Sequence, residues 1–129
     1  MADLSPYGVR ASAGSLRAAD GVVLPHVWTE EGVAAGPVAN GAQAFHLSVA
    51  LCVLNDVYRE AELLGIPVQG VAVVADGGFD VTWASTGISY QAEVDSPADP
   101  SDVRRLLDVV DEVAEIPRAV RAGAEVTRR

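Results

Sequence analysis

The chain has 129 residues, half of them apolar, which suits one domain with a single core. Its 18 acidic residues outweigh nine arginines and give a formal charge of −9, so the composition argues against nucleic acid or an anionic membrane surface as a partner. One cysteine cannot form an internal disulfide, no Cys/His pattern predicts a metal site, and no apolar run approaches the roughly 20 residues of a membrane span.

The start of the chain predicts an antiparallel strand pair. Residues 7–17 and 22–28 would form the two strands, and Ala19-Asp20-Gly21 carries the Asp-Gly signal of the turn between them. Residues 30–41 are rich in Gly, Ala and Glu and predict a loop. The chain is therefore expected to open with a hairpin.

A long helix should follow this loop. Asn40 is a good N-cap, and Gly65 with Pro67 should end the helix after Leu64. The middle of this helix is apolar on nearly every side, and a helix that is apolar all round is normally buried all round. A domain of 129 residues rarely encloses a helix so completely, so we expect a second subunit to help to cover it.

The second half of the chain predicts strands followed by helices. The expected elements are strands at 68–75 and 87–94, a turn at 76–78, a strand or loop at 79–83, a helix at 103–114 that starts from Asp99-Pro100, a short helix from Pro117 to Gly123, and a strand at 124–127. Because strands and helices segregate rather than alternate, we expect an α+β fold in one domain, residues 1–129.

Two segments in this order resemble the OsmC/Ohr family of osmotically induced and hydroperoxide-reducing proteins. Leu47-Ser-Val-Ala-Leu-Cys52 is similar to the family's helical segment that ends in its reactive cysteine. Ile116-Pro-Arg-Ala-Val-Arg-Ala-Gly-Ala-Glu-Val-Thr127 is similar to its C-terminal Cys-Pro segment. The resemblance covers roughly residues 7–127. It implies an OsmC-like fold, with strands packed around a long central helix in an intertwined homodimer, and a protein of the stress response. The weight of Ala, Val and Arg in the composition fits a GC-rich bacterial genome.

The resemblance also implies roles for single residues. Cys52 takes the position of the cysteine that attacks the peroxide, whereas Ile116 replaces the resolving cysteine and Ala42 replaces the glutamate that positions the thiol. Arg17 is our candidate for the family's thiol-activating arginine, and Arg10 is the competitor. Without a resolving cysteine, the disulfide step of the family cannot occur within this chain.

The surroundings of Cys52 in the sequence are unfavourable for this chemistry. A thiol buried among apolar side chains has a raised pKa, and only a nearby cation can ionise it. Ser48 and Asn55 share the helix face of Cys52, so they indicate a small pocket or a helix–helix contact. His46 could line the same cavity as a general base, or be a partly buried structural histidine; His26 is a weaker candidate.

These residues leave two functional hypotheses. In the first, Cys52 reduces an organic hydroperoxide as a one-cysteine oxidoreductase, and an external thiol regenerates it. In the second, a binding protein or non-redox tailoring enzyme holds a small organic molecule in a pocket at the dimer interface. Either protein is expected in the cytoplasm, without cofactor or metal, and without nucleic acid or membrane as a partner.

Overall fold

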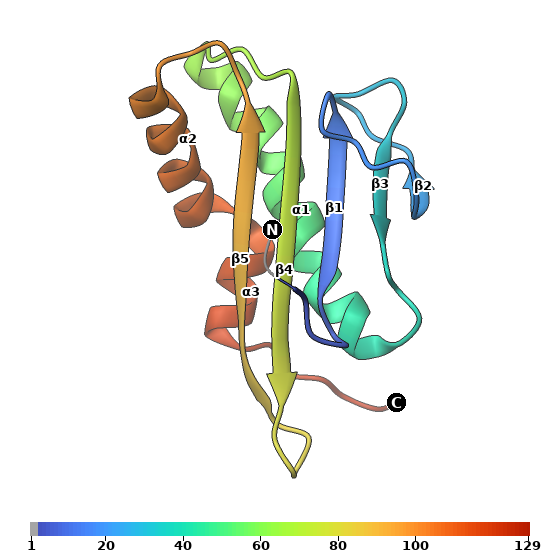
Figure 1. Ribbon diagram of the computed structural model, residues 1–129. Coiled ribbons are helices and arrows are strands. Elements are labelled where there is room, and N and C mark those ends of the chain that lie inside the picture. Colours follow the sequence, from blue (N-terminus) through green and yellow to red (C-terminus); the bar gives the residue numbers. More distant parts are fainter. Residues whose placement is uncertain (1–2) are drawn as a thin grey trace.

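The computed structural model describes residues 3–129, which form an antiparallel sheet covered on one face by helices (Figure 1). The strands are β1 (Val9–Gly14), β2 (Val22–Leu24), β3 (Val33–Gly36), β4 (Gly70–Phe79) and β5 (Ser85–Asp95), and the helices are α1 (Gly41–Leu64), α2 (Pro100–Val113) and α3 (Glu115–Ala122). The sheet order is β2-β3-β1-β4-β5. The predicted α+β fold is confirmed. Within the described residues, no helix is long and apolar enough to cross a membrane.

The order of the N-terminal strands corrects the expected hairpin. β1 does not pair with β2, because β3 lies between them and pairs with both. The predicted loop 30–41 thus contains a strand. Its Val-Ala-Ala-Gly sequence has only one β-branched residue. Ala34 and Ala35 are nevertheless buried, since small residues fit a strand that is paired on both edges.

The β4–β5 hairpin corrects a second prediction. The residues Asp76-Gly-Gly78, expected as a turn, continue β4, and the chain turns at 80–84 instead. A Cβ atom at Gly77 would lie 2.3 Å from the carbonyl oxygen of Gly87 and 2.9 Å from Nε2 of His46. Glycine is therefore present for close packing rather than for a reversal of the chain.

Helix α1 has the predicted bounds. The Asn40 side chain accepts a hydrogen bond from the backbone N–H of Gln43, and Gly65 ends the helix with φ of 70°. The last helix begins at Glu115, two residues before the predicted start at Pro117. Proline is tolerated inside this first turn because the N–H groups there have no partner within the helix. Residues 124–127 form no strand, contrary to the prediction.

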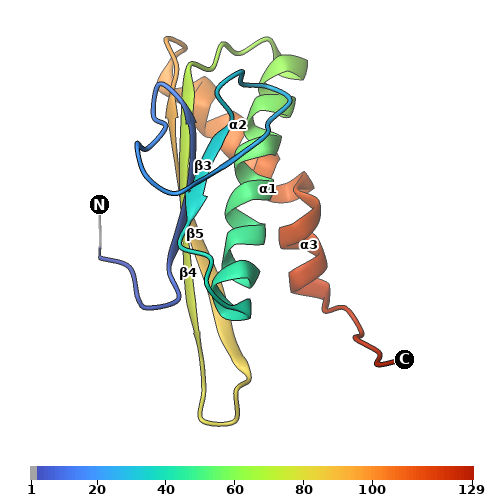
Figure 2. The same ribbon diagram turned by 90° about the vertical axis from the view of Figure 1, so that its right-hand side faces the viewer.

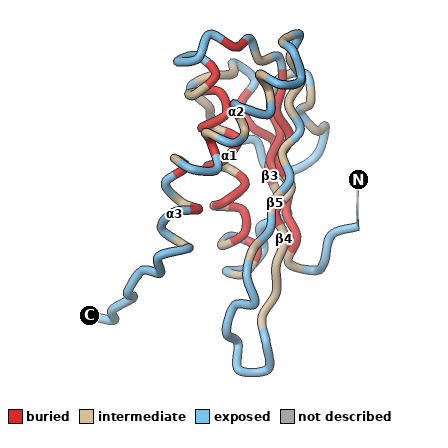
Figure 3. Tube along the Cα trace, turned by 90° about the vertical axis from the view of Figure 1, so that its left-hand side faces the viewer, coloured by how far each residue is buried: buried red, intermediate tan, exposed pale blue. Residues whose placement is uncertain are grey.

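The core lies between the sheet and α1, and α2 and α3 pack on the same side of the sheet (Figures 2 and 3). Val9, Ala11 and Ala13 of β1 point into this core, and they pack with residues of α1 such as Val53 and Leu54. One chain thus buries half of the residues of α1 by itself. Ser48, Leu51 and Asn55 of α1 stay half-buried, so the expected second subunit remains a prediction for this part of the helix.

Candidate functional site

Cys52 lies in the middle of α1 with 8% of its surface exposed. Its Sγ atom donates a hydrogen bond to Oδ2 of Asp56, one helical turn further on, at 3.6 Å. Positions i and i+4 of a helix share one face, so the sequence spacing itself brings this thiol and this carboxyl together.

Asp56 is fully buried, and its carboxyl group is held from two sides. The side-chain amide of Asn55 donates to Oδ1 at 3.1 Å, and a guanidinium nitrogen of Arg59 lies 3.2 Å from the same atom. Arg59 also lies 3.6 Å from a carboxylate oxygen of Glu115, the first residue of α3. The ion pairs therefore join α3 to α1 directly beside the thiol.

We call Cys52, Asp56, Arg59 and Glu115 the inner cluster. Single ligand atoms of Cys52, Asp56 and Glu115 lie within 4.8 Å of one another, which is a spacing that a metal ion can bridge. Here the Arg59 guanidinium already supplies a positive charge to both carboxylates. The two carboxylates thus share one ion-pair network with Arg59.

The inner cluster disfavours ionisation of the thiol. The pKa of Cys52 is raised to about 12, chiefly because the thiol is buried. A hydrogen bond from the backbone N–H of Ile116 lowers this pKa, whereas the negative charges of Asp56 and Glu115 raise it. Burial also raises the pKa of Asp56. A backbone hydrogen bond at its own N–H lowers the pKa of Glu115, with Arg59 as a smaller contributor. At neutral pH the sulfur is therefore a protonated thiol.

The two arginines proposed from the sequence lie elsewhere in the chain. Arg17 is exposed in the connection after β1. Arg10 belongs to β1, where Val9 and Ala11 point into the core, so alternation places Arg10 on the opposite face of the sheet from α1. Arg59 is the arginine of the inner cluster, and it contacts Asp56 and Glu115 rather than Cys52.

Of the other predicted pocket residues, the structure brings only Asn55 to the inner cluster. His46 is fully buried, its Nδ1 lies 2.8 Å from the backbone oxygen of Tyr7, and its ring stacks on Phe79 at 6.0 Å. Ser48 donates to the backbone oxygen of Phe45 in its own helix at 2.6 Å. These contacts hold both side chains in place in one chain, while Nε2 of His46 is buried without a hydrogen-bond partner within the described residues.

Sequence reasoning missed Asp56, Arg59 and Glu115. The first two could have been found, because i+4 from Cys52 and then i+3 from Asp56 place each residue over its predecessor on the helix. Glu115 adjoins Ile116, the residue at the expected resolving position, but its contact with α1 depends on how α3 packs. No pattern in the neighbouring sequence predicts how α3 packs on α1.

No protein-family model matches this chain, and no curated protein matches it. The chain is similar to the crystal structure of an OsmC-like hydroperoxide resistance protein from Jannaschia sp. CCS1, with a TM-score of 0.52 and 15% sequence identity. The similarity covers 95% of this chain and 90% of that protein. The chain therefore has the OsmC-like fold that its two sequence segments predicted.

Proposed function

We propose that this OsmC-like chain recognises a small organic molecule without redox chemistry, and that Cys52 acts as a protonated hydrogen-bond donor. The observation that carries the proposal is the contact of the thiol with Asp56 in place of a cation. Attack on a peroxide needs a thiolate. With a pKa of about 12, only about one Cys52 in 10⁵ is ionised at pH 7.

The C-terminal segment supports the same proposal. Ile116 stands at the expected resolving position, and its backbone N–H, rather than a second sulfur, faces the thiol. Arg59 is engaged by Asp56, Glu60 and Glu115, so its charge is balanced by carboxylates. A thiol in such surroundings behaves as a small polar core residue.

We further propose that the chain works in the cytoplasm as a homodimer whose second copy packs on the half-buried face of α1. Ser48, Leu51 and Asn55 form this face at helical spacing. Sedimentation equilibrium should give twice the chain mass, and Leu51→Glu should yield monomers, because a charge at the centre of a helix contact is costly to bury. A chain that sediments as a monomer at all concentrations would exclude the dimer.

The redox test uses purified protein, cumene hydroperoxide and either dihydrolipoamide or a second thiol reductant. We expect hydroperoxide consumption at the rate of the reductant alone, both for the wild-type chain and for Cys52→Ser. Faster consumption that disappears in Cys52→Ser would contradict the proposal.

A second candidate is one-cysteine hydroperoxide reduction, which the Cys52–Asp56 contact and the OsmC-like fold favour. A nucleophile within reach of a carboxylate that other groups orient is the usual arrangement of a nucleophile and its base. Sulfur would attack the peroxide oxygen as the O–O bond breaks, and Asp56 would take the thiol proton and deliver it to the departing alkoxide. The products are an alcohol and a Cys52 sulfenic acid, which an external thiol reduces.

Asp56→Asn separates the two candidates. If Asp56 serves as a base, this variant reduces hydroperoxide more slowly than the wild-type chain. If Asp56 keeps the thiol protonated, the variant reacts faster with any thiol reagent. The non-redox proposal requires the second result.

A further inference from the structure

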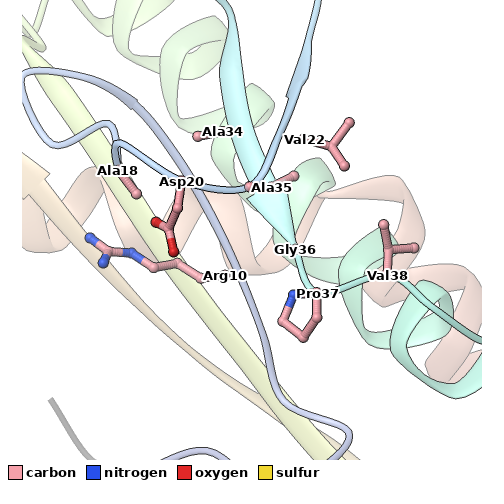
Figure 4. Close-up of a pocket in the computed structure, with 10 residues that line it drawn as sticks. Arg10, Ala18, Asp20, Val22, Ala34, Ala35, Gly36, Pro37 and Val38 are labelled. Carbon is pink, nitrogen blue, oxygen red and sulfur yellow. The ribbon is translucent and has the colours of Figure 1, made fainter.

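A cavity of about 420 Å³ lies at the β3–β1 part of the sheet, on the face that carries no helix (Figure 4). We call it the outer cavity. It is lined by Arg10 of β1, by Ala18, Asp20 and Gly21 between β1 and β2, by Val22 of β2, and by Ala34, Ala35, Gly36, Pro37 and Val38 at the end of β3. Its volume falls in the range of small-molecule sites.

The wall of the outer cavity is held in place by the chain. The backbone N–H of Ala18 donates to Oγ of Ser12 at 2.8 Å, and Ser12 is fully buried although it belongs to the outer face of β1. The connection between β1 and β2 is thereby folded over this face. It carries Asp20 to the cavity that Arg10 lines.

The Nε atom of Arg10 lacks an acceptor within the described residues. Its side chain is half-buried, its Nε atom is shielded from solvent, and Nε has no hydrogen-bond partner within residues 3–129. A shielded guanidinium donor without a partner costs free energy, and a carboxylate matches its fork of N–H groups best. The Arg10 side chain therefore provides an anchor for an anionic group of a ligand.

The remaining walls limit the ligand further. Asp20 reaches the cavity beside Arg10 but forms no ion pair with it within the described chain, so both charges are open to a ligand. Val22 and Val38, which are 51% and 43% exposed, lie at the other end with Pro37 and offer an apolar contact. A ligand with a carboxylate for Arg10, an ammonium group for Asp20 and a short aliphatic chain for the apolar end would match these walls.

We propose that the outer cavity binds a small amino-acid-like zwitterion, with its carboxylate on Arg10, its ammonium group on Asp20 and its aliphatic part on Val22, Pro37 and Val38. This inference rests on the proposed binding function and gives it a ligand class. It does not involve Cys52, so the thiol experiments and the binding experiment can fail separately.

Isothermal titration with three probes tests the proposal: L-leucine, 4-methylpentanoate, which lacks the ammonium group, and 3-methylbutylamine, which lacks the carboxylate. Leucine should bind most tightly, 4-methylpentanoate several-fold more weakly, and the amine weakest. Arg10→Gln should weaken leucine by about tenfold or more, and Asp20→Asn should bring leucine to the level of 4-methylpentanoate. Arg17→Gln, an exposed arginine of the same connection, is the matched control and should bind like the wild-type chain.

The proposal is overturned if neither acid binds at about 10 mM, if Arg10→Gln binds leucine as the wild-type chain does, if Asp20→Asn leaves leucine binding unchanged, or if the amine binds as tightly as the acids. Circular dichroism and the melting temperature establish that each variant is folded. A readout on the unaltered protein is the Nε–H cross-peak of Arg10 in ¹⁵N NMR spectra. This peak should shift on titration with leucine, and an unmoved peak during saturable binding would also overturn the assignment.

Discussion

Two arginines of this chain stand in opposite situations. Arg59 lies among three carboxylates, which balance its charge and connect α1 with α3. Arg10 lines the outer cavity with a shielded Nε that has no partner within the described residues. The two arginines therefore differ in whether their guanidinium groups have partners within the described residues. Each charged group of the inner cluster has an ion-pair partner within the cluster, which therefore serves the structure, whereas the outer cavity retains an anchor that a ligand can use.

The largest expected effect comes from breaking the inner cluster. Arg59→Met leaves the fully buried Asp56 without its cation, and we expect the free energy of unfolding in urea to fall by about 2–4 kcal/mol. The control is Arg105→Met, which removes an exposed pair with Asp102 and should cost at most about 1 kcal/mol. Equal losses in the two variants would mean that the inner cluster has no special structural weight.

The buried thiol should make the protein sensitive to alkali. The folded chain raises the pKa of Cys52 from 9.0 to about 12, so between these values the unfolded state loses a proton that the folded state keeps. The contribution of Cys52 to the free energy of unfolding is fully present below pH 9. Above pH 9 it falls by up to about 1.4 kcal/mol per pH unit. Urea unfolding of the wild-type chain and of Cys52→Ala between pH 8 and about pH 10 should show a steeper fall for the wild type. Parallel curves would place the pKa of Cys52 near its ordinary value.

The effect of Asp56 on the thiol should be smaller but specific. Asp56→Asn removes a negative charge beside Sγ, lowers the pKa of Cys52 and should speed alkylation by iodoacetamide about three- to tenfold at pH 8. Glu112→Gln, at an exposed acid of α2, should react at the wild-type rate. Slower alkylation of Asp56→Asn would instead identify Asp56 as a base for Cys52.

The smallest effect is expected at the other arginine. Arg10→Gln removes a guanidinium that has no ion pair within the described chain. The melting temperature should therefore match that of the wild type, and the free energy of unfolding should change by no more than about 0.5 kcal/mol. A loss comparable to that of Arg59→Met would show that Arg10 is a structural residue. The contrast between the two arginines would then be wrong.

Features whose signals lie in a few neighbouring residues could be predicted from the sequence. Asn40 and Gly65 define the ends of α1 through local capping, and Asp99-Pro100 marks the start of α2. The two segments around Cys52 and Ile116 predicted the OsmC-like fold, which the structural comparison confirms.

The rest depends on packing between distant segments. Strand β3 contains small residues, which by themselves predict a loop. They form a strand because β1 and β2 pair on either side of them. Gly77 and Gly78 read as a turn because the approach of Gly87 and His46 to β4 is absent from the local sequence. Within the inner cluster, Glu115 was missed for the same reason, since it meets Arg59 only when α3 packs against α1.

The central claim is that burial, reinforced by the charges of the inner cluster, keeps Cys52 protonated, and the pH dependence of Cys52 alkylation tests this claim most directly. With one cysteine in the chain, the rate of iodoacetamide reaction reports on Cys52 alone. The rate should rise about tenfold per pH unit from pH 7 to about pH 10 without a plateau, as a pKa of about 12 requires. A plateau below pH 9 would show a thiolate at accessible pH and would contradict the account.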